Sequence, residues 1–477
     1  MYFRCVLSLV LVLISASIAD ADEYRMENFR YGYQALGTGG AMIARPTTPM
    51  ATYYNPAGLA FQKRSAVSGS IHFFGTEKFV LKDGLRSDGQ WSKDLASNTD
   101  IALPSSSVVT LNIDDSHRIA FSTYLVSNSN QNFQNSLKPI DVGENGVQHQ
   151  YLMALTRVVQ DRQTWMGPSY AVALNEQWSL GASVFYARRS MYWQTETRLQ
   201  DEQSGPDIID RAVFYDIQSK TVIKDGRLIL RVGGSWAPSE NTSVGLVLTT
   251  PSMRLHGDAR LTVNELWSGD PDDPDSDMAF ADHFVQKADA ETASPWGLSF
   301  GVQFQRPGRY VLALATDLWL PLSYNRIRLD AGRSEEARAI RDQFAASVDR
   351  DWLVNAKVGL EIFTFDAFPI RMGLYSNRSA AHSVPDRSRR YRAPKVDVYG
   401  AAFSLGYSTK DAGISVGVNV ERGQGDDLVE EDVLESYTDA PKIRVERTHS
   451  KVIFFVAGAL GFASKTAQRY FDERQSK

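Results

Sequence analysis

The sequence has very little cysteine and histidine, no excess of positive charge and no long hydrophobic run. Its single cysteine, Cys5, stands near the N-terminus, so a chain processed beyond it has no thiol and forms no disulfide. The seven histidines are scattered without metal-ligand spacing, and we expect neither a metal nor a cofactor. A net charge of −5 excludes a strongly basic nucleic-acid-binding protein. Beyond the N-terminal segment, no stretch reaches the ~18 consecutive apolar residues of a transmembrane helix.

Residues 1–21 are typical of a cleavable signal peptide. Arg4 precedes an apolar run over residues 5–14, and small residues follow, so cleavage after Ala19 or Ala21 satisfies the small-x-small rule. The apolar run is too short to span a bilayer as a helix. The sequence therefore predicts an exported protein that crosses a membrane, if at all, as strands.

Most of the chain alternates between apolar and small or polar residues. Leu298, Phe300 and Val302, for example, alternate with Ser299 and Gln303. Similar stretches occur at residues 67–73, 178–186, 228–236, 296–304 and 414–420. A period of two indicates strands with one apolar face. A mean hydropathy of −0.28 does not argue against a membrane, because barrels dilute lipid-facing residues with polar lumen residues.

The connections between these stretches alternate between short and long. Short turns are predicted near 114–117, 175–177, 238–241, 306–308, 365–368 and 409–411. Long loops are predicted at 75–104, 128–146, 200–226, 257–292, 329–350, 379–394 and 423–448, with 329–350 partly helical. This regular sorting favours an outer-membrane barrel over a soluble β-sandwich. With residues 147–174 read as one strand, the prediction is an all-β, antiparallel transmembrane barrel of about fourteen strands over residues 65–462, followed by a tail at 463–477.

Ahead of the first predicted strand, residues 36–61 are rich in glycine and proline. One glycine-rich corner surrounds Gly39 and a second surrounds Gly58, and Pro46 and Pro49 lie between them. Such a segment extends neither a long helix nor a central strand. It predicts a compact hatch, or plug, over residues 22–64 inside the barrel.

These motifs resemble the FadL-type family of outer-membrane transporters for long-chain fatty acids and other hydrophobic compounds. The resemblance rests on G-x-G-x-A-x-x-A from Gly37, Y-Y-N-P-A-G-L-A from Tyr53, the hairpin at 238–257 and P-D-x-x-R from Pro385, in consistent order along the mature chain. The corresponding hatch-motif residues are Gly37, Gly39, Gly40, Asn55, Pro56, Ala57 and Gly58. One departure is the segment 22–33, which is charged and aromatic where the family has a short run of small apolar residues.

The resemblance implies a monomer in the outer membrane of a Gram-negative bacterium. It implies passive uptake of hydrophobic molecules, with ligand leaving laterally or through the hatch, and contact with outer-membrane lipid and lipopolysaccharide. The segment 127–130, which follows a predicted strand and is a poor strand former, is the candidate for a lateral gap. No nucleic-acid partner and no enzymatic activity are expected. The alternative is a similar barrel that serves as an adhesin or a platform for a secretion partner.

Two groups of residues are candidate ligand contacts. Phe29 and its alternating neighbours Tyr31 and Tyr33 either line an apolar pocket or pack the plug against the wall. Alternation also places charged residues in the lumen, namely Arg227, Arg231, Asp317, Lys357, Glu361 and Arg371. Of these, Arg231, Lys357 and Arg371 either receive an anionic head group or simply satisfy a polar interior.

Two further motifs carry less weight. Residues 297–301 match G-x-S-x-G, but they lie inside a predicted strand rather than at the strand-to-helix turn that a nucleophile requires. Residues 269–277 form an acidic loop that lacks the glycine and terminal glutamate of an EF-hand. We interpret the first as small lumen residues and the second as a solvated loop, with a calcium-binding or lipopolysaccharide-bridging role as the alternative for the loop.

Overall fold

The structure, a computed structural model, describes residues 24–87, 91–137, 140–142, 148–205, 208–268, 279–328, 347–365, 367–388, 392–409, 411–431 and 441–462. Within these ranges, no helix is both long and apolar enough to cross a membrane. The expected signal peptide, the acidic loop 269–277, most of 329–350 and the tail 463–477 lie outside the described residues.

Strands make up most of the described chain, and two short helical segments precede them. The helix α2 spans Ala51–Tyr54 and the 3-10 helix η1 spans Pro56–Phe61. The strands of the first half are β1 (Ser65–Ser87), β2 (Trp91–Asp100), β3 (Leu103–Asn112), β4 (His117–Leu137), β5 (Ile140–Val142), β6 (Gln148–Ala173), β7 (Trp178–Gly205), β8 (Ile208–Ser239), β9 (Thr242–Thr249), β10 (Met253–Ser268) and β11 (Ala279–Ala290). Those of the second half are β12 (Gly297–Arg306), β13 (Tyr310–Trp319), β14 (Leu322–Asn325), β15 (Ile327–Arg328), β16 (Ser347–Arg350), β17 (Leu353–Phe365), β18 (Phe368–Asn377), β19 (Arg387–Ser388), β20 (Lys395–Ser408), β21 (Ala412–Glu430) and β22 (Lys442–Phe462).

Short turns join the strands at one end of the sheet, close to the predicted positions. They include residues 113–116, 174–177, 240–241 and 307–309. In the first of them the Asp114 carboxylate accepts the backbone N–H groups of Ser116 and His117, at 2.7 and 2.8 Å. These bonds lower the pKa of Asp114, because they stabilise its charged form. Since short turns face the periplasm in outer-membrane barrels, we name this the periplasmic end and the opposite one the external end.

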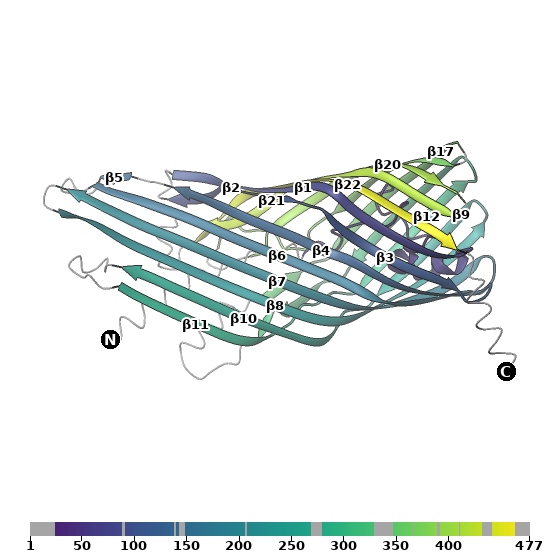
Figure 1. Cartoon of the computed structure of the whole chain (residues 1–477), viewed down its shortest axis with the longest axis horizontal. Coiled ribbons are helices and arrows are strands. Elements are labelled where there is room, and N and C mark those ends of the chain that lie inside the picture. Colours follow the sequence, from purple (N-terminus) through teal and green to yellow (C-terminus); the bar gives the residue numbers. More distant parts are fainter. Residues whose placement is uncertain are drawn as a thin grey trace.

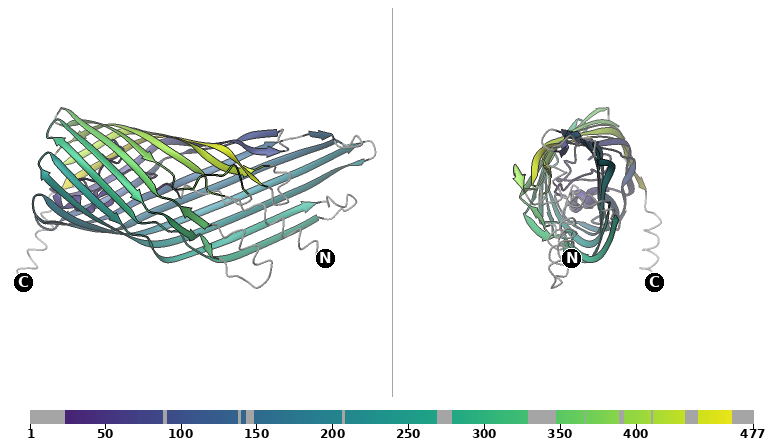
Figure 2. Two further views of the ribbon diagram at one scale, coloured as in Figure 1. Left: turned by 180° about the vertical axis from the view of Figure 1, so that it is seen from behind. Right: turned by 90° about the vertical axis from the view of Figure 1, so that its left-hand side faces the viewer.

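The sheet closes because its first and last strands pair. β1 and β22 form an antiparallel ladder from Ser65↔Phe462 to Leu81↔Arg447. Three crossings of the wall each consist of two consecutive strands in line: β2 with β3, β9 with β10, and β11 with β12. Counted in this way, the described residues form a closed antiparallel barrel of 14 strands, which confirms the predicted fold class (Figures 1 and 2). The segment 147–174 contributes the single strand β6, as expected.

Near the periplasmic end, the outward face of the barrel is an apolar belt. Its exposed members include Phe73, Phe121, Trp178, Val184, Leu230, Trp236, Leu298, Leu314, Val358, Met372, Phe403, Val416 and Phe454. Trp178 and Trp236 stack with ring centroids 5.3 Å apart, at the edge where tryptophan marks a membrane interface. The inward positions between them are small or polar and buried, such as Ser179 and Ser235. The predicted faces of these strands are confirmed.

The predicted long loops were wrong over much of their length, because several are extensions of strands. β6, β7 and β8 contain 26, 28 and 32 residues, whereas a tilted strand crosses a bilayer in about 9–11. Together with β10 and β11 they project beyond the apolar belt at the external end (Figure 1). The barrel is therefore taller on this side than on the side of β17 and β20.

Alternation persists in these extensions, but the polarity of the two faces is inverted. On β7, the belt residue Val184 is exposed and Ser183 is buried, whereas further along Gln194 faces outward and Met191 and Trp193 are buried. The inversion follows from the change of solvent, since water rather than lipid surrounds the extension. A polar outward face made these segments look like loops in the sequence.

The inward side chains of the extensions pack together into one apolar cluster, which we name the external cluster. It comprises Phe79, Leu81, Leu85, Leu95, Phe133, Leu137, Met153, Leu155, Val159, Met191, Trp193, Ile217, Ile223, Ala259, Leu261, Val263, Ala290, Ile327, Val429 and Val445. These residues lie on β21, β22, β1 and β2 and on the long strands from β4 to β11, with Ile327 of β15, and none lies on β12, β13, β17, β18 or β20. The external part of the lumen is therefore apolar on its tall side.

The inverted polarity of the two faces can be tested with two substitutions on the outward face of β7. Val184→Arg on β7 is expected to impair assembly, because arginine facing lipid costs about 2–4 kcal/mol at mid-bilayer. Gln194→Arg, on the same face but beyond the belt, should leave assembly unchanged. The measurement is the amount of heat-modifiable barrel in outer-membrane fractions. Equal losses for both variants would mean that the belt does not end between these positions.

Candidate functional site

Residues 24–64 lie inside the barrel, and we name this segment the plug (Figure 2, right). Wall glycines let its backbone approach the barrel directly. A Cβ atom at Gly181 would lie 2.5 Å from the carbonyl carbon of Pro56, and one at Gly359 would lie 2.7 Å from Cβ of Thr38. Equivalent close approaches occur at Gly233, Gly245, Gly301 and Gly373. The plug thus contacts successive strands from β7 round to β18.

The predicted hatch-motif residues form the two corners of the plug. At the first corner Gly39 and Gly40 adopt φ values of 65° and 83°, which only glycine adopts readily. At the second, the buried Asn55 side chain donates to the carbonyl oxygens of Ile43 (2.8 Å) and Gly234 (3.1 Å) and accepts the N–H of Ala57 (3.1 Å). Asn55 therefore joins the plug both to itself and to β8, and Pro56 then starts η1.

The first residues of the plug, 24–30, cross the lumen and bind its wall on several sides; we name them the strap. Glu27 forms an ion pair of 2.5 Å with Lys357 on β17. Arg30 pairs with Glu421 on β21 at 3.0 Å and lies 3.2 Å from the ring centroid of Tyr375 on β18. Asn28 donates to Ser127 on β4, at 3.2 Å. The charged residues that distinguish this segment in the sequence are thus matched by charges on the wall.

The three predicted aromatic contacts separate into different environments. Phe29 stacks on His72 with centroids 5.1 Å apart, beside a cavity. Tyr31 is fully buried among other aromatic rings, and its hydroxyl donates to the carbonyl of Leu125 on β4 at 2.8 Å. Tyr33 lies under the Arg371 guanidinium, 5.4 Å from the ring centroid. Only Phe29 borders a described cavity, and the other two pack the plug against the wall.

The three predicted cations are all buried, and two of them have carboxylate partners. Lys357 binds Asp317 at 2.8 Å in addition to Glu27. Arg371 binds Glu361 through two nitrogens, at 2.7 and 3.0 Å. Arg231 lies 5.0 Å from the ring centroid of Tyr53 in the plug.

Burial raises the pKa of Tyr53 to about 12, so its hydroxyl stays protonated well into the alkaline range and gives Arg231 no negative charge to pair with. In this closed arrangement, the carboxylates of Glu27 and Asp317 neutralise Lys357, and that of Glu361 neutralises Arg371. These two cations therefore offer little to a free anion.

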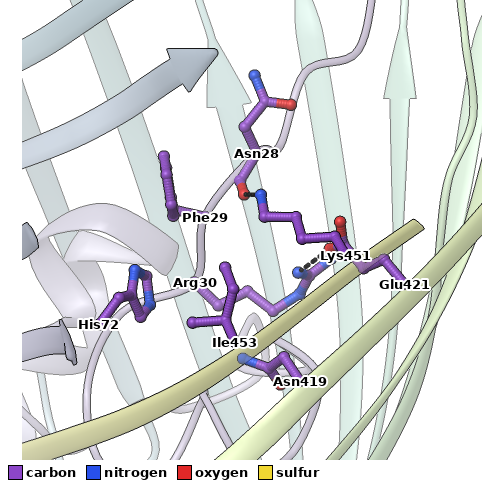
Figure 3. Close-up of a pocket in the computed structure, with 8 residues that line it drawn as sticks. All are labelled: Asn28, Phe29, Arg30, His72, Asn419, Glu421, Lys451 and Ile453. Carbon is purple, nitrogen blue, oxygen red and sulfur yellow. Dashed lines mark hydrogen bonds and ion pairs between the residues drawn. The ribbon is translucent and has the colours of Figure 1, made fainter. Parts of the chain in front are cut away.

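Two adjoining cavities lie between the strap and the wall formed by β1, β21 and β22. The first is lined by Asn28, Phe29, Arg30, His72, Asn419, Glu421, Lys451 and Ile453 (Figure 3). The second shares Asn28, Glu421 and Lys451 with it and extends to residues 127–129 of β4. Each has space for about one water molecule. A molecule larger than water therefore occupies this region only when the strap moves.

Several polar atoms that line the first cavity are buried but lack a hydrogen-bond partner. Arg30 Nη2, His72 Nδ1 and Asn419 Oδ1 are buried without a hydrogen-bond partner in the structure. A buried polar atom without a partner costs about 1–3 kcal/mol, and a water molecule in this cavity would supply a partner for these atoms. The sequence analysis missed these residues as a group, although alternation placed Asn419 in the lumen and the charges of 22–33 were the available signal for Arg30.

A break in the backbone ladder of the wall borders the second cavity. The β3–β4 ladder ends at the pair Ser106↔Tyr124, and β4 is irregular between Leu125 and Ser127. Beyond this point β2 pairs with β1, and among the described residues no ladder joins it to β4. We name this boundary the seam.

Side chains bridge the seam in place of a backbone ladder. The Asn132 N–H donates to Ser97 Oγ at 2.7 Å, and the Asn135 side chain donates to the carbonyl of Asp94 at 2.7 Å. β4 itself continues through residues 127–130, where the sequence suggested a gap, and keeps its ladder with β6. The loss of pairing is therefore on the β2 side of the strand only.

The fold and the plug define a closed, plugged barrel of the outer-membrane type. Solved structures of FadL-type proteins share this fold: a Pseudomonas aeruginosa FadL homologue is 14% identical, with a TM-score of 0.62, over 91% of this chain and 99% of that one. The toluene transporter TodX of Pseudomonas putida is 14% identical, with a TM-score of 0.52, over 93% of this chain and 100% of that one.

The toluene transporter TbuX of Ralstonia pickettii is 12% identical, with a TM-score of 0.50, over 92% of this chain and 99% of that one. No protein-family model and no curated protein sequence matches the chain. At these identities the similarity establishes the fold, which is that of the FadL-type barrels, as the sequence motifs suggested.

The corner at Asn55 supports a prediction about leakage. Asn55→Leu removes the three hydrogen bonds of this side chain and leaves buried groups unsatisfied, at about 1–3 kcal/mol each. The plug should loosen and single-channel recordings should show ion conductance that the native protein lacks. Asn241→Leu, in an exposed turn, is the control. A silent Asn55→Leu channel with native thermal stability would show that this corner does not hold the plug.

Proposed function

We propose that the protein is a passive uptake channel for hydrophobic molecules in the outer membrane of a Gram-negative bacterium. The observation that carries this proposal is the order of environments along the lumen: an apolar external cluster, then a closed polar plug, then a seam in the wall. An ion or sugar channel requires a continuous water-filled path, which this order interrupts. A hydrophobic solute requires an apolar entrance and an exit that avoids the aqueous lumen.

The external cluster would supply the entrance. Its residues line the lumen beyond the belt, on strands whose outward faces are polar. These residues are buried against one another in the closed state. An apolar ligand that inserts among them would gain about 25 cal/mol per Å² of its own apolar surface removed from water. A ligand entering from the external end would therefore partition into this cluster before it reaches the strap.

The strap and the seam would control the exit. The second cavity connects them, because it is lined by strap residues such as Asn28 and by Ser127 and Ser129 on the β4 side of the seam. Displacement of the strap would widen this cavity toward the wall where β2 and β4 lack a backbone ladder. Ligand would then leave sideways at the external edge of the belt, where β4 carries Asn128 on its outward face, and pass into the outer leaflet without an open path for ions.

The ion pairs of the closed lumen bear on whether the substrate is charged or uncharged. The lysine and one of the arginines expected to receive a carboxylate, Lys357 and Arg371, already bind carboxylates. At these two cations this favours uncharged apolar molecules over fatty-acid anions, and Arg231, which has no carboxylate partner among the described residues, is the remaining candidate for an anionic head group. The toluene transporters TodX and TbuX share the fold, which is consistent with an uncharged substrate.

Uptake into proteoliposomes tests the function. Purified protein should accelerate the entry of labelled toluene, and glucose should not enter. An uncharged aromatic is expected to enter faster than a long-chain fatty acid at equal concentration. Lack of acceleration for both apolar compounds would overturn the proposal and leave the adhesin or secretion-platform role as the better hypothesis.

A covalent lock across the seam tests the lateral exit. Ser97→Cys/Asn132→Cys introduces one thiol on each side of the seam, at two residues whose Ser97 Oγ and Asn132 backbone N–H lie 2.7 Å apart, in a mature chain that we expect to contain no other cysteine. Joining them with a short bifunctional thiol reagent should abolish uptake of apolar solutes and leave the barrel heat-modifiable, because the wall can no longer separate there.

The control places the same reagent across an intact ladder. Ser107→Cys/Thr123→Cys joins register partners of β3 and β4 that are already paired. Uptake should survive this lock. If uptake persists at the native rate with the seam joined, the ligand leaves through the plug and the lateral route is wrong.

A further inference from the structure

Five basic residues lie together on the outer face of the barrel, directly above the apolar belt. They are Arg162 on β6, Arg188 on β7, Lys224 on β8, Arg260 on β10 and Lys287 on β11, and all five are exposed. We name them the basic patch. The five strands are consecutive neighbours in the wall, so the patch follows the circumference of the barrel on one side.

Strand register shows how closely these side chains are grouped. Ser190 on β7 is the register partner of both Arg162 and Lys224, so the two cations flank it on the same face. Arg260 is directly opposite Lys287. Like charges on opposed positions of a sheet repel one another, so the arrangement is unfavourable unless an anion lies between them.

The basic patch has little acidic compensation. None of the five cations forms an ion pair with a residue that the structure describes. Asp258, the register partner of Lys224, is the one carboxylate in the same rows that is not itself in an ion pair with another residue. Asp289 lies 3.8 Å from Arg254 instead. The patch therefore carries an excess of positive charge.

Charges farther from the membrane on the same strands behave differently. Arg198 on β7 binds Asp216 on β8 at 2.9 Å and Glu196 at 3.2 Å. Lys220 lies 5.2 Å from the ring centroid of Tyr192. The excess of positive charge is thus limited to the band next to the belt, where the head groups of the outer leaflet lie.

We propose that the basic patch binds the phosphate groups of a phosphorylated glycolipid in the outer leaflet, of the lipid A type. Arginine and lysine are the residues that bind phosphate through charge-assisted hydrogen bonds. The acyl chains of such a lipid would lie along belt residues of the same strands, including Val184, Leu230 and Leu255. A bound lipid would hold the tall side of the barrel, which includes β6 to β11, in the outer leaflet. The proposal does not depend on which molecule the barrel transports.

Native mass spectrometry of the full-length mature protein tests the proposal, with lipid A and its dephosphorylated form as the two probes. Arg162→Gln/Arg188→Gln/Lys224→Gln should lower the fraction of barrel with bound lipid A by about tenfold or more. The double variant Arg188→Gln/Lys224→Gln should lower it as well, whereas its matched control Arg198→Gln/Lys220→Gln, which removes one arginine from β7 and one lysine from β8, should bind as the native protein does. The native protein should bind the dephosphorylated lipid at least about tenfold less.

The faster migration of unboiled protein on gels verifies that each variant is folded. If the triple variant is not folded, Arg162→Gln and Lys224→Gln are measured singly and each should reduce binding about two- to fivefold. Equal binding of the phosphorylated and dephosphorylated lipids by the native protein would overturn the proposal. So would equal losses in the basic-patch and control variants, or no retained lipid A at all.

Discussion

Contact between the backbone of the plug and the inner wall of the barrel is the constraint on which the rest of the structure depends. It requires glycine on the wall at Gly181 and Gly359, where any side chain would occupy the place of the plug. Because the gap is closed by backbone rather than by long side chains, the plug fits in one position. That position places the strap across the lumen, and the two cavities that the described residues form beside it are water-sized.

The strands were predictable from the sequence wherever lipid surrounds the barrel and the lumen side is polar. In the belt, lipid outside and polar side chains inside give the alternation of Leu298 with Ser299, and the single strand over 147–174 followed from the same pattern. Beyond the belt, residues such as Gln194 face water and Trp193 faces the lumen. The period is unchanged, but a segment that is polar outside and carries many charges has the composition of a loop. Composition therefore misled where periodicity would have been the better guide.

The candidate site was less predictable, because it depends on pairings between distant residues. Glu27 and Lys357 are joined by a hydrogen bond across 330 positions, and Arg30 and Glu421 across 391. Alternation placed Lys357 in the lumen, but it could not reveal that a charge in the plug neutralises it. The same applies to Arg30, whose role became visible only with its partner. Residues of the hatch motif were recognisable from the sequence because they act on the backbone next to them. Glycine allows the chain to turn at one corner, and asparagine followed by proline forms the other.

The ladder that closes the barrel also dictates an order of events in folding. It joins Ser65 to Phe462, almost the whole length of the mature chain, so it forms late in the search for native contacts. The plug precedes Ser65 and is surrounded by wall strands on all sides. A chain cannot thread a compact, glycine-cornered segment into a lumen that is already sealed. The plug and its strap must therefore be in place before β22 pairs with β1. The barrel wall then closes around a plug that is already folded.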